Sequence, residues 1–192
     1  QQTVPPTQPT TTTTITQQIE DIHALKREVV NFVIQNGFSA AAAFVEQELQ
    51  YNHSPEIEKE LESWKTFLES AGQINNYIKQ TLSSRIGKEV NLRYGAQNVR
   101  IIPTSVTETI ITGTVSIPSS SGASISRTIT LEIAKLDPLC KAELLGSADT
   151  PAKAAAKWLL FFQAKKFDSA RQFAASSGPF ADIFMEYASQ KH

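Results

Sequence analysis

The chain has 192 residues, of which 41% are hydrophobic, and its 18 basic and 19 acidic residues give a formal net charge of −1. This balance provides no overall field that would attract nucleic acid or anionic lipid. The single cysteine, Cys140, excludes an intrachain disulfide. No apolar run approaches the roughly 20 residues that a membrane-spanning helix needs, so we expect no transmembrane segment.

The N-terminal tail, residues 1–16, consists almost entirely of Thr, Gln and Pro. A segment with so few apolar residues cannot bury enough surface to offset the entropy of ordering. We expect either a disordered tether or a segment that docks on another subunit as an added strand. Because the chain begins at Gln1 rather than Met, we also expect a processed product, exported or forming the extracytoplasmic part of an anchored protein.

The next part of the chain, residues 17–84, has apolar residues at three- and four-residue spacing, which predicts helices. The first helix is expected to end at Gly37. The second is expected to begin at Ser39, a residue type that caps helices well, and to turn Ala43 inward. Ser54 and Pro55 open a third helix, which keeps its register across Gly72 and is expected to run on to about Ser84.

The segment 88–134 is the only part of the chain in which apolar and polar residues alternate, as in strands with one buried face. Ile129 and Leu131 are expected to face the core, and Thr130 is expected to face water. Short connections, one of them Pro103-Thr104-Ser105, leave no room for crossover helices. The strands must therefore form an antiparallel meander. The expected strands cover about 88–94, 98–102, 107–117 and 124–134.

The C-terminal part, residues 137–190, again reads as helices. Asp137-Pro138 and Thr150-Pro151 repeat the capping arrangement of Ser54-Pro55 and open two helices. Asp168 is expected to cap a further helix, and a last helix follows Gly178-Pro179. We therefore predict an α+β fold of N-terminal helices, a four-stranded antiparallel meander and C-terminal helices, with 17–192 as a single domain closed around one core.

One internal repeat links the two helical parts when Phe38 is placed on Phe167, 129 residues later. Each copy has a helix, an aromatic residue at a turn and a second helix with a small residue at its closest approach. This predicts two αα-hairpins in which alanine lets the helices pack closely. The matched pairs are Phe32 with Phe161, Val33 with Phe162, Ser39 with Asp168, Ala41 with Ala170, and Phe44 with Phe173.

The pattern resembles a degenerate tetratricopeptide-type helix pair over 32–45 and 161–174 only. It departs from that family because it lacks tandem copies with a period of 34 residues and the family's Trp-Leu-Gly run. The resemblance implies helix-pair scaffolding of the kind that binds other proteins.

The residues that could carry chemistry fit no catalytic or metal-binding pattern, so we expect no catalytic, cofactor-binding or metal residues and no cofactor. Cys140 lies among leucines and is expected to be a buried hydrophobe, without a histidine nearby to activate it. His23, His53 and His192 are far apart in sequence and are expected to be solvated or singly hydrogen-bonded.

Two charged sets could carry function, the acidic set as paired catalytic carboxylates and the basic and aromatic set as a nucleic-acid-binding surface. The acidic set is expected to be a solvated helix face. The basic and aromatic set would suit a nucleic-acid-binding sheet surface, although Tyr94 is in register with the core-facing residues of its strand. The acidic set is Glu56, Glu58, Glu60 and Glu62, and the basic and aromatic set is Lys88, Arg93, Tyr94, Arg100 and Arg127.

The function that follows from these features is a non-enzymatic protein-interaction or structural assembly module. Its partner is expected to be a protein or a second copy of the chain, with self-association through the N-terminal tail. The alternative is a nucleic-acid or small-ligand binding domain that uses the sheet surface.

Overall fold

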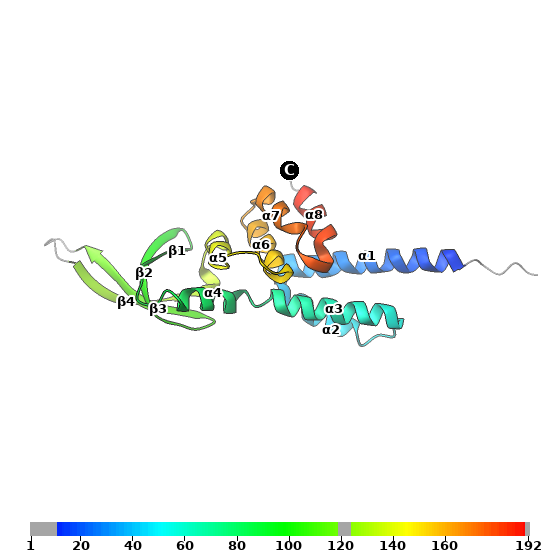
Figure 1. The fold of residues 1–192 in the computed structure, drawn as a ribbon, viewed down its shortest axis with the longest axis horizontal. Helices are drawn as coiled ribbons and strands as arrows, with labels where there is room; N and C mark the ends of the chain where they lie inside the picture. Colours follow the sequence, from blue (N-terminus) through cyan, green and yellow to red (C-terminus); the bar gives the residue numbers. More distant parts are fainter. Residues whose placement is uncertain (1–10, 119–123, 191–192) are drawn as a thin grey trace, which may run out of the picture.

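The computed structural model describes residues 11–118 and 124–190. It has the predicted α+β fold, with helices at both ends of the chain and a four-stranded antiparallel sheet between them (Figure 1). The molecule is elongated, with the sheet at one end and the start of the first helix at the other (Figure 1).

The N-terminal part forms four helices, α1 (Thr11–Asn36), α2 (Phe38–Glu48), α3 (Pro55–Ala71) and α4 (Ile74–Ser83). Helix α1 begins six residues before the predicted start at 17, within the segment expected to be disordered or extended. Once a helix is nucleated, each added residue contributes a hydrogen bond, so it can extend through weak formers such as threonine. The rest of the predicted tail, residues 1–10, lies outside the described residues.

The predicted single helix from Pro55 to about Ser84 is wrong, because it breaks after Ala71. A Cβ on Gly72 would lie only 3.2 Å from the Ser39 hydroxyl oxygen, so glycine permits the close approach of α2 at this point. The break separates two roles. Helix α3 packs on α2, whereas α4 packs on the sheet.

The sheet contains β1 (Val90–Tyr94), β2 (Gln97–Val106), β3 (Ile110–Pro118) and β4 (Ser124–Glu132), in that spatial order. The predicted turn at Pro103-Thr104-Ser105 is instead a β-bulge inside β2. The extra residue returns Val106 to the face on which its partner Ile111 lies. The chain turns later, where the Thr107 hydroxyl accepts hydrogen bonds from the amides of Thr109 and Ile110.

Glycine is required at position 113 by close packing between β2 and β3. A Cβ there would clash with the carbonyl oxygen of Ile102 and would lie 2.7 Å from Cγ1 of Ile101. Ile101 therefore fills the space that any larger residue at position 113 would occupy.

The C-terminal part comprises the 3₁₀ turn η1 (Ile133–Lys135), α5 (Pro138–Leu144), α6 (Pro151–Gln163), α7 (Phe167–Ala174), the 3₁₀ turn η2 (Gly178–Phe180) and α8 (Ala181–Gln190). The three predicted Ser/Asp/Thr-Pro helix starts are confirmed, since the side chains of Ser54, Asp137 and Thr150 accept from backbone amides of the first turn. The predicted caps Ser39 and Asp168 are wrong. Both helices begin one residue earlier, at a phenylalanine.

The buried residues form two clusters, not the single core expected. The helical cluster lies among α1–α3 and α5–α8 and is built around Trp64, Leu68, Trp158, Phe180 and Phe184. The sheet cluster lies between the sheet, α4 and α5, and includes Ile78, Leu82, Leu92, Ile101, Ile111 and Leu131. Most helices thus pack on one another and not on the sheet, and α4 and α5 connect the two clusters.

Candidate interaction surfaces

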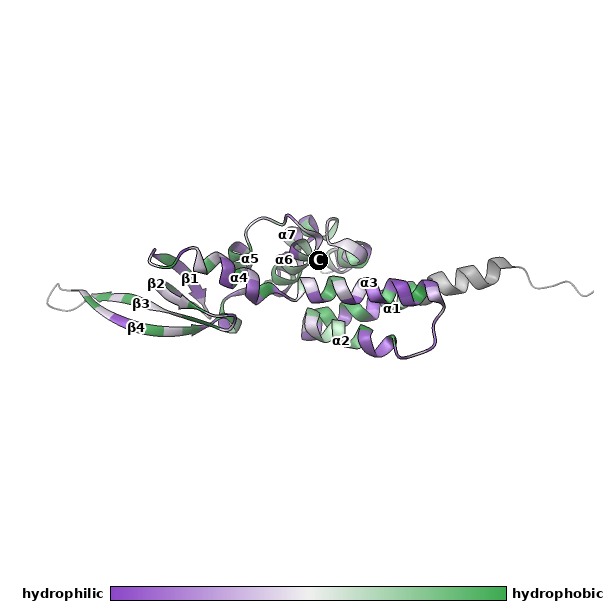
Figure 2. Ribbon diagram, turned by 60° about the horizontal axis from the view of Figure 1, so that its bottom comes forward, coloured by the Kyte–Doolittle hydropathy of each residue, from purple (hydrophilic) through white to green (hydrophobic). Residues whose placement is uncertain are grey.

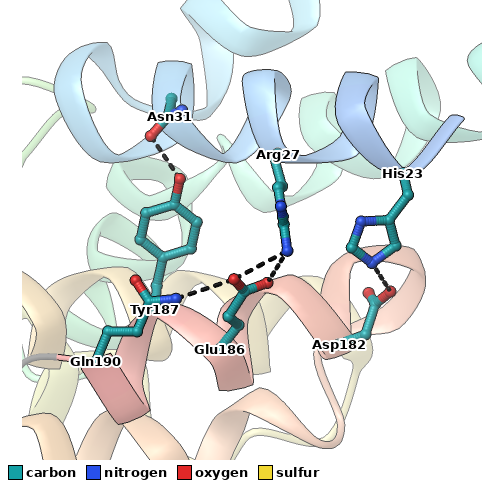
Figure 3. Close-up of polar contacts among 7 residues, drawn as sticks. All are labelled: His23, Arg27, Asn31, Asp182, Glu186, Tyr187 and Gln190. Atoms are coloured by element: carbon teal, nitrogen blue, oxygen red, sulfur yellow. Dashed lines mark hydrogen bonds and ion pairs between the residues drawn. The ribbon is translucent and has the colours of Figure 1, made fainter. Parts of the chain in front are cut away.

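The first and last helices are joined by a row of polar contacts. On α1 these residues recur every four positions and so share one face of the helix. They contact residues on α8 (Figure 3). Nε2 of His23 lies 3.9 Å from the Asp182 carboxylate, the Arg27 guanidinium donates to both carboxylate oxygens of Glu186 at 3.0 and 3.1 Å, and the Tyr187 hydroxyl donates to the side-chain oxygen of Asn31 at 2.7 Å.

Most of these groups are substantially exposed, so each contact is expected to contribute only about 0–1 kcal/mol. Their regular spacing fixes the register of α8 along α1. This row of contacts, which we call the α1–α8 joint, connects the first and last helices, and the polar groups named here are paired with one another (Figure 3).

The internal repeat corresponds to two helical hairpins with equivalent contacts. Phe32 stacks on Phe44 with ring centroids 4.5 Å apart, and Phe161 stacks on Phe173 at 5.4 Å. The prediction that both alanines at the closest approach are buried is confirmed for Ala41.

The second copy behaves in the same way. Ala170 is fully buried, and its amide donates to the Lys166 carbonyl as that of Ala41 donates to the Gly37 carbonyl. Ala43, predicted to face inward, is instead exposed. The paired helices pack on each other through matched phenylalanines and alanines, so the repeat accounts for the packing inside the two hairpins.

The cysteine and the described histidines, considered above as catalytic or metal-binding residues, have different surroundings in the structure. Cys140 is buried, as predicted; the Arg93 amide donates to its sulfur at 3.4 Å, and burial raises the pKa of the thiol. His23 takes part in the α1–α8 joint. His53 Nε2 lies 2.9 Å from the carbonyl oxygen of Glu48, and His192 lies outside the described residues. No group of three or more potential metal ligands occurs in the described part of the chain.

The basic residues of the sheet do not form one surface. Arg93 and Arg100 lie on the outer face, where Arg93 pairs with Asp137 and Arg100 with Glu89, both at 3.5 Å. Arg127 is opposite Val115, on the face that continues the sheet cluster. Tyr94 packs against that cluster, as its register predicted. The acidic residues Glu56, Glu58 and Glu62 are exposed on α3, as predicted, whereas Glu60 is half-buried and lies 3.9 Å from the Lys26 ammonium of α1.

The least covered element is the hairpin formed by β3 and β4, whose far end projects beyond β1 and β2 (Figures 1 and 2). Leu131, near the base of β4, is 6% exposed, whereas Ile125, on the same face near the tip, is 59% exposed. Its cross-strand partner Ile117 is 43% exposed. An apolar pair therefore lies uncovered at the tip of a strand pair that is otherwise continuous with the core.

The two edges of the sheet differ. The C-terminal end of the β1 edge is covered by the chain itself, because Tyr94 bridges to Leu136, the Asp137 amide donates to the Arg93 carbonyl, and the Gly95 amide donates to the Lys135 carbonyl. Within the described residues, β4 pairs with β3 alone. It is therefore the uncovered edge strand.

The direction of the backbone groups of β4 follows from its ladder. The Ile133 amide donates to the Thr109 carbonyl, and hydrogen-bonded pairs alternate along an antiparallel ladder that runs without a bulge. The odd-numbered residues of β4 thus bond to β3, and the even-numbered ones direct N–H and C=O groups outward. We call these outward groups the β4 edge; they belong to Ser124, Ser126, Thr128, Thr130 and Glu132.

The sequence predicted β4 but gave no reason to single out its edge. The sequence alone can indicate only part of this arrangement. Alternation places the Ser and Thr residues on one face, but which edge stays open depends on Leu136 and Asp137 covering β1, a long-range contact.

The comparisons with known proteins give no relatives. No protein-family model matches the chain, and neither a curated protein nor a solved structure matches it significantly. Among the helices within residues 11–118 and 124–190, none is both long and apolar enough to cross a membrane.

Proposed function

We propose that the chain is a non-enzymatic protein-interaction module of the structural or assembly type, and that it binds an extended segment of another polypeptide along the β4 edge. The observation that carries this proposal is the asymmetry of the two sheet edges. The chain covers the C-terminal end of β1 with its own η1–α5 segment but leaves the outer edge of β4 without a strand partner among the described residues. Such an edge is a template for strand addition.

The surroundings of the edge support the same function. Strands that must stay unpaired usually carry lysine, proline or a bulge. The nine residues of β4 contain none of these, although Arg127 is a charged residue on the inner face, which also discourages pairing, and Glu132 lies at the end of the strand. The exposed pair Ile117 and Ile125 adds apolar surface beside the backbone groups. Main-chain hydrogen bonds would provide affinity, and the isoleucines would favour β-branched or aromatic residues in the bound strand.

The other predicted surfaces contribute less to a function. The helical hairpins bury their matched alanines and stack their matched phenylalanines on one another, so a tetratricopeptide-like role would need a different helix face. A nucleic-acid-binding sheet is the weaker alternative because Arg93 and Arg100 are each paired with a carboxylate. In the proposed module the helical part serves as the body from which the hairpin projects.

The test is a selection of displayed random peptides on the immobilised chain, followed by binding to a variant with a blocked edge. Thr128→Pro removes one outward N–H and leaves the bonds to β3 in place, so the fold should persist. Thr114→Ala, on the same face but in β3, is the matched control. We expect selected peptides to be extended, free of proline, and to lose affinity for Thr128→Pro alone. Peptides that bind both variants equally would contradict the proposal.

A further inference from the structure

The β4 edge is complementary to a second copy of itself. A two-fold axis perpendicular to the sheet relates two antiparallel copies of β4. The core-side faces of both copies then lie on the same side of the joined sheet, and residues whose backbone groups point outward pair with one another. With the axis at Thr128, Ser126 lies opposite Thr130 and Ser124 opposite Glu132 of the second copy. Every residue of the nine-residue strand then has a partner.

The side chains favour this register over the registers with the axis one residue earlier or later. An axis at Arg127 would place two arginines directly opposite each other, which is unfavourable. An axis at Ile129 would place Ser124 and Ile125 opposite residues 134 and 133, which have left the strand for η1. The axis at Thr128 avoids both problems. It places Arg127 opposite Ile129 of the second copy, and the exposed Ile125 opposite Leu131 at the margin of the sheet cluster.

The N-terminal residues 1–10 are a less suitable occupant of the edge. Ten residues span at most about 36 Å. Helix α1, with 26 residues, is about 39 Å long and begins at the end of the molecule away from the sheet (Figure 1). Ten residues are therefore too few to connect the start of α1 to β4 of the same chain. In a neighbour's tail, the consecutive Pro5 and Pro6 would leave at least one ladder-facing position without an N–H, because successive residues point to opposite sides.

We infer that the chain forms a two-fold symmetric dimer in which β4 pairs antiparallel with β4 of a second copy about Thr128, joining two four-stranded sheets into one. The inference rests on the proposed function, since it names the occupant of the β4 edge. The formal net charge of −1 adds little repulsion between two copies.

Cysteine cross-linking tests both the pairing and its register. Cα atoms of a directly hydrogen-bonded antiparallel pair lie about 5.5 Å apart, within the range of a disulfide. Under mild oxidation Thr128→Cys should form a covalent dimer by itself. Ser126→Cys and Thr130→Cys should cross-link efficiently only when the two variants are mixed. Thr114→Cys, on the same face but in β3, and the wild-type chain with its buried Cys140 are the controls.

Sedimentation velocity over a concentration series provides a second readout. The wild-type chain should pass from monomer to dimer, and Thr128→Pro should shift the midpoint on the order of tenfold or more, because both bonds at the symmetry axis are lost. A chain that stays monomeric, or Thr128→Cys cross-linking no better than Thr114→Cys, would overturn the inference.

The remaining outcomes separate this inference from the proposed function. Association that disappears on deletion of residues 1–10, without cross-linking at Thr128, would mean that a neighbour's tail occupies the edge. Edge-dependent binding of selected peptides by a monomeric chain would likewise overturn the dimer and leave the proposed function in place. Loss of both peptide binding and dimerisation would reject both.

Discussion

Two substitutions on the same face of β4 test whether the base of the strand is buried and its tip exposed. Leu131 and Ile125 both lie on the face of β4 that continues the sheet cluster, but they are 6% and 59% exposed. Leu131→Ala removes a buried side chain and should lower the free energy of unfolding by about 2–5 kcal/mol. Complete burial of an isoleucine contributes about 1.5–3 kcal/mol, so Ile125→Ala, with less than half of that burial, should cost about 1 kcal/mol or less.

The assay is urea unfolding at a concentration low enough to keep the chain monomeric, followed by far-ultraviolet circular dichroism and by tryptophan fluorescence. Both tryptophans, Trp64 and Trp158, belong to the helical cluster, so fluorescence reports on the part of the molecule away from Leu131. If 17–192 is a single cooperative domain, the two probes give the same midpoint in Leu131→Ala. Equal losses in the Leu131 and Ile125 variants would refute the assignment of a buried base and an exposed tip.

Three further predictions concern packing and reactivity. Gly113→Ala should destabilise the chain by about 1–3 kcal/mol in the same assay, because the added methyl group meets backbone that cannot move freely. Ala41→Leu and Ala170→Leu should each cost about 1–3 kcal/mol, whereas the exposed Ala43→Leu should be nearly neutral, and three equal values would argue against the close helix approach. Burial raises the pKa of the Cys140 thiol, so the native chain should react slowly with a thiol reagent at pH 8 and fully only after denaturation; rapid reaction of the native chain would contradict this.

The fold was largely predictable because its signals are local. The alternation in β4 and the Ser54, Asp137 and Thr150 caps each depend on residues within a few positions of one another. The errors arose where contacts between residues distant in sequence determine the local structure. The helix breaks at Gly72, where Ser39 of α2 approaches closely, and the bulge in β2 keeps Val106 on the face that β3 requires.

The candidate site was less predictable than the fold. The sequence predicted an antiparallel meander, but it could not show that Tyr94 would be bridged by Leu136 while the outer edge of β4 stayed open. Arg93 and Arg127 looked like parts of one basic surface because each lies in a strand. Alternation within each strand already indicates opposite faces, since Arg127 is in register with the core-facing Ile129 and Leu131 whereas Arg93 alternates with core-facing residues, and the pairing register agrees.

The most direct test of the β4 edge is amide hydrogen exchange, resolved by residue with nuclear magnetic resonance, at low and high protein concentration. The inward amides of Arg127 and Ile129 should be protected at both concentrations because they bond to β3. The outward amides of Ser126, Thr128 and Thr130 should exchange rapidly when dilute and become protected when concentrated. Outward amides that exchange at the same rate at both concentrations would contradict pairing of β4 with a second copy.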